Sequence, residues 1–202
     1  MLHNLLKNKD IILASKSPRR AFLLQQIGLK FSQISSNIEE VENEMSPEDF
    51  VVYYSLKKAE KIFKSNPNSF VIGVDTIVFI DNKIIGKPKN RNQAKKFLQT
   101  LSGNCHTVLS GISILYKDKI ISRVEKTKVC FKQILEKDIE EYIKTNEPMD
   151  KAGAYGIQGF GSQFIKKIEG CYFNVMGFPI PLFYEMVQKT LKVSKTLKVF
   201  IH

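Results

Sequence analysis

The chain has 202 residues, of which 43% are hydrophobic and 25% charged, and its formal net charge is +11. This length allows one large domain or two small lobes, and the composition is that of an ordinary soluble protein with no apolar run of membrane-spanning length and no signal-peptide pattern. The positive charge is compatible with binding to nucleic acid, to an anionic membrane surface or to a polyanionic small substrate. The lysines are spread along the chain, which weakens the interpretation as a nucleic-acid-binding protein.

The cysteines are few and scattered, at Cys105, Cys130 and Cys171. Their number is odd and no Cys-x-x-Cys spacing occurs, which argues against zinc. We therefore expect free thiols in a reducing cytoplasm.

A short buried strand is expected at residues 11–14, followed by a helix in which Ser17 is the N-cap, Pro18 the first residue and Gly28 the stop signal. The loop and first turn gather side chains that can bind phosphate oxygens: Ser15, Ser17, Arg19 and Arg20. The positive charges of these arginines lie at the positive end of the helix dipole, which weakens the helix slightly. They make more sense as partners of an anion, because one guanidinium group can bind two phosphate oxygens. The stretch predicts a phosphate site, and the alternative is a capped surface helix with solvated arginines.

A strand is expected at residues 31–35, and Glu39 and Glu40 then open an acidic stretch in an otherwise basic chain. Carboxylate oxygens suit a hard divalent cation, whereas the alternative is a solvated loop. A second helix begins at Ser46 and Pro47 by the same capping logic and carries an apolar stripe as far as residue 63.

The strongest strand covers residues 70–80, is apolar on both faces and is interrupted by Asp75. A carboxylate in such a run is costly unless it is paired, hydrogen-bonded, protonated or metal-bound. We favour a functional acid over an aspartate held by backbone N–H groups. Asp75 and Thr76 should point to opposite faces, so both can reach one site only if the strand bends, as Gly73 would permit.

The middle of the chain predicts a hairpin turn into residues 84–85, a helix at 91–101, two strands at 107–115 and 120–131, and a helix at 136–145. Pro88 should hold the preceding Lys87 more firmly than a typical surface lysine. His106 is interpreted as structural.

Residues 150–161 contain four glycines, which let the backbone turn sharply or approach a ligand. The spacing fits neither a Walker A loop nor a dinucleotide fingerprint. Within this segment Gln158 offers a donor and an acceptor on one amide, which suits the edge of a base, although the segment could simply connect two lobes. A strand at 162–168 and a helix at 181–191 complete the expected elements.

Several stretches together resemble the Maf-type nucleoside triphosphate pyrophosphatases, most closely their dTTP/UTP branch. The matching stretches are residues 13–20, 37–40, 58–59, 73–76, 86–88, 101–103, 150–161 and 174–179. The resemblance implies an α/β fold with a mixed, elongated sheet flanked by helices, in which residues 1–202 form a single catalytic domain of two lobes around a central cleft, similar to inosine triphosphatases. It also implies a homodimer that cuts nucleoside triphosphates to the monophosphate and pyrophosphate with a divalent metal. From the composition, the cysteines and the spread of the lysines we expect a cytoplasmic protein that binds no membrane and forms no stable nucleic-acid complex.

The resemblance also implies roles for single residues. Asp75 corresponds to the catalytic acid/base. Substrate-binding positions are Ser15, Arg19, Arg20, Lys58, Thr76, Lys87 and Gln158. A divalent cation, Mg²⁺ or Mn²⁺, is implied, with Glu40 and Asp75 as metal ligands; Asp75 would either bind this cation or take the proton from the attacking water. Cys171, Phe173 and Asn37 depart from the usual family pattern.

The alternatives are a 7-methyl-GTP pyrophosphatase of the same family, a nucleic-acid-binding protein and a regulatory protein of cell division. Exposed aromatic residues interleaved with a stripe of basic residues would favour a nucleic-acid-binding protein. The aromatic residues here mostly follow helix and strand periodicity and therefore favour core positions, and no stretch indicates a partner surface.

Overall fold

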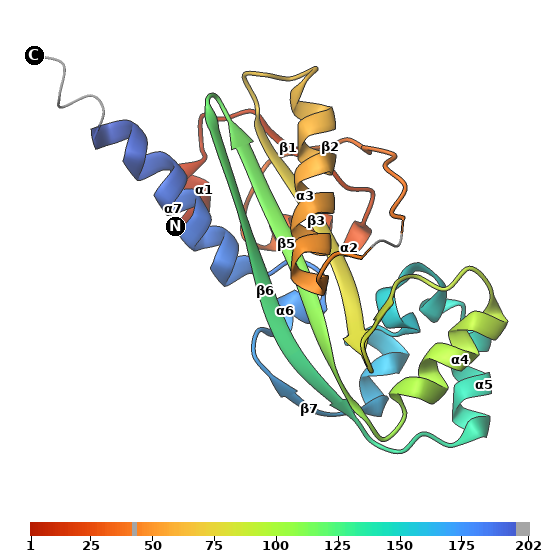
Figure 1. Cartoon of the computed structure of the whole chain (residues 1–202). Coiled ribbons are helices and arrows are strands. Elements are labelled where there is room, and N and C mark those ends of the chain that lie inside the picture. Colours follow the sequence, from red (N-terminus) through yellow and green to blue (C-terminus); the bar gives the residue numbers. More distant parts are fainter. Residues whose placement is uncertain (42–43, 197–202) are drawn as a thin grey trace, which may run out of the picture. The chain divides into compact units, whose positions relative to one another are not determined.

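The computed structural model describes residues 1–41 and 44–196, and contains a mixed sheet with helices against it (Figure 1). In this part of the chain the strand order is β2-β1-β3-β5-β6-β7, with β4 paired to β3. The strands are β1 (Ile11–Leu13), β2 (Ser32–Gln33), β3 (Phe70–Ile80), β4 (Lys83–Ile85), β5 (Cys105–Tyr116), β6 (Lys119–Phe131) and β7 (Ile165–Glu169). β1 runs parallel to β2 and β3, whereas the β3–β4 and β6–β7 pairs are antiparallel, which confirms the mixed α/β prediction.

The α-helices are α1 (Leu2–Leu5), α2 (Pro18–Gln26), α3 (Pro47–Phe63), α4 (Arg91–Leu101), α5 (Glu136–Lys144), α6 (Tyr172–Val175) and α7 (Ile180–Thr196). Short 3₁₀ helices follow α5: η1 (Glu147–Asp150), η2 (Ala152–Ala154) and η3 (Gly159–Phe164). Both predicted caps are present, because the side chains of Ser17 and Ser46 accept hydrogen bonds from backbone amides in the first turns of α2 and α3. None of the helices in the described residues is long and apolar enough to cross a membrane.

The chain divides into two compact units. Unit 1 comprises Met1–Asp75, Gly111–Val124 and Gly177–His202, and unit 2 comprises Thr76–Ser110 and Glu125–Met176. The boundary falls inside β3, directly after Asp75. That the units are the lobes of one catalytic domain around a cleft stays a prediction.

Unit 1 is built around the packing of α3 on the sheet (Figure 1). Ala59 and Ile62 of α3 share an apolar cluster with Val71 of β3 and Leu115 of β5. A Cβ atom at Gly73 would lie 2.0 Å from the carbonyl oxygen of Ser55. The expectation that Gly73 permits a bend is therefore not what we find: β3 continues through it, and the missing side chain makes room for the helix backbone.

A similar contact lies on β5, where a Cβ atom at Gly111 would be 2.2 Å from the carbonyl oxygen of Val51 on α3. Between these two close approaches, the hydroxyl groups of Ser55 and Ser113 are hydrogen-bonded at 2.8 Å. These two glycines, on neighbouring strands, thus determine how closely α3 packs on the sheet and at which point along the strands. They thereby determine the position of Lys58 on α3.

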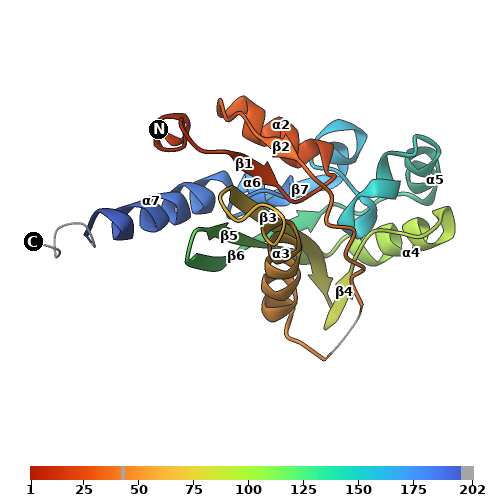
Figure 2. The ribbon, with the colours of Figure 1, turned by 90° about the horizontal axis from the view of Figure 1, so that it is seen from above.

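Unit 2 has its own core, in which α4 and α5 lie side by side (Figure 2). Leu98 of α4, Ile139 of α5 and Phe131 of β6 are buried in it. The helix predicted at 91–101 is confirmed as α4, and its Ala94, Leu98 and Leu101 are fully buried. The predicted strand at 162–168 begins only at Ile165, because residues 159–164 form η3.

The expectation of free cysteines is wrong for two of the three. Cys105 at the start of β5 and Cys130 on β6 form a disulfide, with their Cα atoms 3.9 Å apart, and Cys171 is free. The sequence separation of 25 residues concealed the pairing, because only the hairpin of β5 and β6 brings the two positions together.

Candidate active site

The loop between β1 and α2 is organised by Ser15 and Arg20. The buried Ser15 hydroxyl accepts hydrogen bonds from the Ser17 amide at 3.2 Å and from the Arg20 guanidinium at 2.9 Å. Arg20 also donates to the carbonyl oxygens of Val74 and Gly177, at 3.0 and 2.9 Å. This arginine therefore joins the β1–α2 loop to β3 and to the chain before α7.

Burial lowers the pKa of Arg20, and the negative charges of Asp75 and Glu40 oppose this effect. The adjacent Arg19 is half-buried at the same helix start. Arg20 thus has a structural role that the sequence did not predict, and phosphate binding by Arg19 and Arg20 stays a prediction.

Asp75 is 2% exposed, and its partner is the ammonium group of Lys58. The Nζ atom of Lys58 lies 2.6 Å from Oδ1 of Asp75 and 2.5 Å from Oε1 of Glu40. A lysine predicted to bind phosphate therefore joins the predicted catalytic acid and the predicted metal ligand. It can hold this place because Gly73 lets α3 approach β3 so closely.

Burial raises the pKa of Asp75 to about 6, although the positive charge of Lys58 opposes this effect. The second oxygen, Oδ2, is buried and has no hydrogen-bond partner. An acid of this kind exchanges a proton near neutral pH and has one oxygen left to bind a proton, a water or a cation.

The remaining predicted residues belong to unit 2. The Thr76 hydroxyl is hydrogen-bonded to the Ser110 hydroxyl at 2.9 Å. Lys87 follows β4 and is exposed, and Gln158 is exposed in the glycine-rich segment. The structure therefore brings together Ser15 with Arg20, and Lys58 with Asp75 and Glu40, whereas the placement of Thr76, Lys87 and Gln158 with them stays a prediction.

Comparisons with known proteins show the family of this chain. The family model of the Maf-like proteins matches residues 10–190. The chain belongs to the Maf family. A dTTP/UTP pyrophosphatase of Dictyoglomus turgidum is 45% identical over 176 residues, which cover 85% of this chain and 91% of that protein. A dTTP/UTP pyrophosphatase of Bacillus anthracis is 44% identical over 188 residues, or 92% of this chain and 98% of that protein.

In this Maf-family chain, the glycine-rich segment is held by two residues that sequence reasoning missed. The Glu147 carboxylate accepts hydrogen bonds from the amides of Phe160 and Gly161, and Tyr142 donates its hydroxyl to the same carboxylate. A glutamate eleven residues before Gln158 carries no signal of this role in a single sequence, because only the turn after α5 folds it back onto the segment.

The buried His106 is structural in this Maf-family protein, as expected. Its Nε2 atom is 2.7 Å from the Tyr155 hydroxyl, and its ring packs edge-on against Phe131 and Tyr155. Burial lowers its pKa to about 4, so the ring is neutral at physiological pH.

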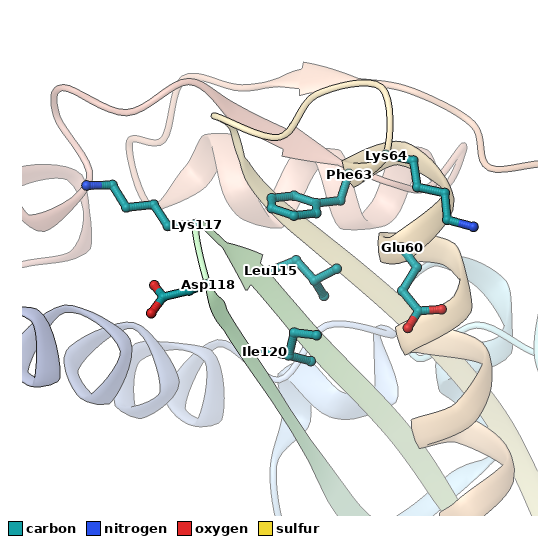
Figure 3. Close-up of a pocket in the computed structure, with 7 residues that line it drawn as sticks. All are labelled: Glu60, Phe63, Lys64, Leu115, Lys117, Asp118 and Ile120. Atoms are coloured by element: carbon teal, nitrogen blue, oxygen red, sulfur yellow. The ribbon is translucent and has the colours of Figure 1, made fainter.

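An apolar hollow of about 410 Å³ lies in unit 1, between α3 and the β5–β6 hairpin (Figure 3). Phe63 of α3 and Leu115 and Ile120 of the β5–β6 hairpin form its floor, and charged residues surround it. It contains none of the predicted site residues, and nothing in the structure shows what covers it.

Proposed function

We propose that this protein hydrolyses dTTP and UTP to the nucleoside monophosphate and pyrophosphate. The relatives that share 44–45% of its residues carry the name dTTP/UTP pyrophosphatase. The observation that carries the proposal is the buried pair of Asp75 and Lys58, since a proton-exchanging acid beside fixed positive charge suits hydrolysis of a phosphoanhydride.

In this mechanism the Asp75 carboxylate takes the proton from the attacking water. Lys58 and the arginines of α2 provide positive charge for the phosphate oxygens, on which negative charge develops in the transition state. Lys58 is already fixed by its two carboxylates, so little reorganisation is needed when substrate binds.

In place of the general-base role, Asp75 is proposed as a ligand, together with Glu40, of a divalent cation. The Oδ2 atom of Asp75 is buried without a hydrogen-bond partner, and the exposed Glu40 is paired with the same Lys58 ammonium group as Asp75. The described residues contain no cluster of three or more acidic, histidine or cysteine ligands, but Mg²⁺ commonly uses one or two carboxylates together with substrate phosphates. Mg²⁺ or Mn²⁺ would neutralise phosphate oxygens there.

Gln158 is proposed to recognise the base. Uracil and thymine present an N–H donor between two carbonyl acceptors, and a primary amide can pair with one donor and one acceptor. The exposed position of Gln158 in unit 2 leaves its amide accessible to a ligand. Thr76 and Lys87 are proposed to assist substrate binding on the strength of the family resemblance.

The proposal also includes a homodimer, as the family resemblance implies, located in the cytoplasm and without a stable nucleic-acid complex. Light scattering on the purified protein tests the oligomeric state, and a gel-shift assay tests nucleic-acid binding.

The deciding experiment measures pyrophosphate release with Mg²⁺ across dTTP, UTP, CTP, ATP, GTP and 7-methyl-GTP. We expect dTTP and UTP to react well, CTP less, and ATP and GTP poorly. A preference for 7-methyl-GTP would instead indicate the other branch of the family, and no release from any triphosphate would overturn the enzymatic proposal.

A further inference from the structure

Glu147 makes an unusual set of contacts in unit 2. Its Oε2 atom accepts the amide of Phe160 at 2.9 Å, and its Oε1 atom accepts the amide of Gly161 at 3.1 Å and the hydroxyl of Tyr142 at 2.9 Å. Tyr142 in turn accepts the amide of Gly156 at 3.2 Å. One carboxylate and one hydroxyl thus bind both ends of the segment 156–161, and Gln158 lies between those ends.

Two glycines of this segment lie against the same two side chains. A Cβ atom at Gly159, whose φ is +78°, would lie 2.5 Å from Oε2 of Glu147, and one at Gly161 would lie 2.6 Å from both the Tyr142 hydroxyl and the Gly156 carbonyl oxygen. Any side chain at either position would push the segment away from its support. The close backbone approach that the sequence indicated is therefore made, in these two places, to Glu147 and Tyr142.

Glu147 is itself fixed by its surroundings. Its amide donates to the Thr145 hydroxyl at 3.1 Å, and its carbonyl oxygen accepts from the Lys151 ammonium at 2.6 Å. The Tyr142 ring is 3% exposed and packs edge-on against Phe164. Hydrogen bonds from backbone amides to a carboxylate are charge-assisted, so they hold the segment more firmly than neutral contacts would.

We propose that Glu147, supported by Tyr142, is a positioning residue for base recognition, which fixes the backbone on which Gln158 meets the pyrimidine. This inference rests on the proposed function, because it assigns Glu147 a role only through Gln158. Neither Glu147 nor Tyr142 needs to contact the substrate. A displacement of about 1 Å in a recognition group can cost on the order of 100-fold in rate, so loss of this support should be visible in base selectivity.

The test compares Glu147→Ala, Glu147→Gln and Tyr142→Phe with the wild type. The glutamine variant keeps one oxygen but places an amide donor against the Phe160 amide, so it should be intermediate. The phenylalanine variant keeps the ring packing and removes only the hydroxyl, which guards against an alanine variant that fails to fold. Glu141→Gln is the matched control, because Glu141 is exposed and forms an ion pair with Lys137 at 4.0 Å on the surface of α5.

We expect Glu147→Ala to raise the KM for dTTP by ~10-fold or more, while the inhibition constant of inorganic pyrophosphate changes less than about two-fold. Pyrophosphate reports on the phosphate site alone, so a general structural defect would change both constants. Equal changes in both, or an unchanged KM for dTTP in Glu147→Ala and Tyr142→Phe, would overturn the inference.

A double-mutant cycle with Gln158→Ala separates this inference from the proposed function. If Glu147 acts through Gln158, Glu147→Ala should cause no further loss of dTTP-over-ATP selectivity once Gln158 is removed. Additive losses would overturn the positioning role while the dTTP and UTP activity stands. A wild type with equal rates on all bases would overturn the proposed function and this inference together.

Discussion

The carbonyl oxygen of Ser55 occupies the space next to Gly73 that a side chain would need: a Cβ atom built on Gly73 would lie 2.0 Å from it. Because α3 rests directly on the β3 backbone here, Lys58 reaches Asp75 two residues further along the strand. The ion pair of the candidate site thus depends on a residue without a side chain.

Gly73→Ala should therefore destabilise the protein and disturb the site. The methyl group would overlap backbone atoms that cannot rotate away, so we expect a loss of more than about 2 kcal/mol in the free energy of unfolding, in the range of other overpacked cores. Gly86→Ala is the control, because nothing lies within 4 Å of the corresponding Cβ position. Urea denaturation of both variants measures the effect, and equal stabilities would contradict the packing argument.

Asp75→Asn should remove activity while the protein still folds. The amide is nearly isosteric but cannot accept a proton, and loss of a general base typically costs 10²–10⁴-fold, so we expect a fall in kcat of ~10²-fold or more. Asp81→Asn is the matched control, since Asp81 is exposed at the end of the same strand. An Asp75→Asn variant that keeps more than about half of the wild-type turnover would contradict the assignment.

The same variant yields a pH prediction for the metal-free protein in a chelator. The pKa of Asp75 is raised from 3.8 to about 6 in the fold, so the unfolded chain releases this proton first as the pH rises. Between about pH 4 and pH 7 the wild type should therefore lose up to about 3 kcal/mol of stability relative to Asp75→Asn. Unfolding curves of both proteins at several pH values measure the difference, in which the other carboxylates cancel. If the difference in unfolding free energy between the two proteins did not change with pH, the pKa of Asp75 would not be raised in the folded protein.

Gln158→Glu should lower the use of dTTP and UTP. The change removes the amide donor and places a carboxylate against a carbonyl oxygen of the base, so that this carbonyl loses its hydrogen-bond donor. Because the side chain is exposed, we expect a loss of ~10-fold in kcat/KM, less than a closed pocket would give. Gln163→Glu, at another exposed glutamine of unit 2, controls for the added charge. Unchanged selectivity would exclude Gln158 as the residue that recognises the base.

The disulfide predicts a thiol count. Protein purified without reductant and then denatured should present one reactive thiol, that of Cys171, and three after reduction. Cys171→Ser should present none before reduction. Three thiols in the unreduced wild type would show that Cys105 and Cys130 are not joined.

The amino-acid sequence alone determined the main helices and strands, because their capping residues and apolar periodicity are local signals. Ser17 and Ser46 begin α2 and α3 as expected, and the long apolar run of β3 lies within the sheet. The sequence also singled out Asp75, because burying a carboxylate in an apolar strand costs free energy in any fold. The family resemblance, which no single motif carried, agrees with the comparison over residues 10–190.

Only the tertiary structure decided which side chains meet. Lys58 and Asp75 are 17 residues apart, Arg20 and Gly177 are 157 apart, and no local pattern encodes such contacts. The glycines show the same limit. From the sequence, Gly73 was expected to permit a bend, and the glycines near Gln158 a sharp turn or the approach of a ligand. In the structure α3 rests against Gly73, and Glu147 and Tyr142 lie against Gly159 and Gly161. A missing side chain signals that something approaches closely, and the identity of that neighbour is fixed by packing between segments distant in the chain.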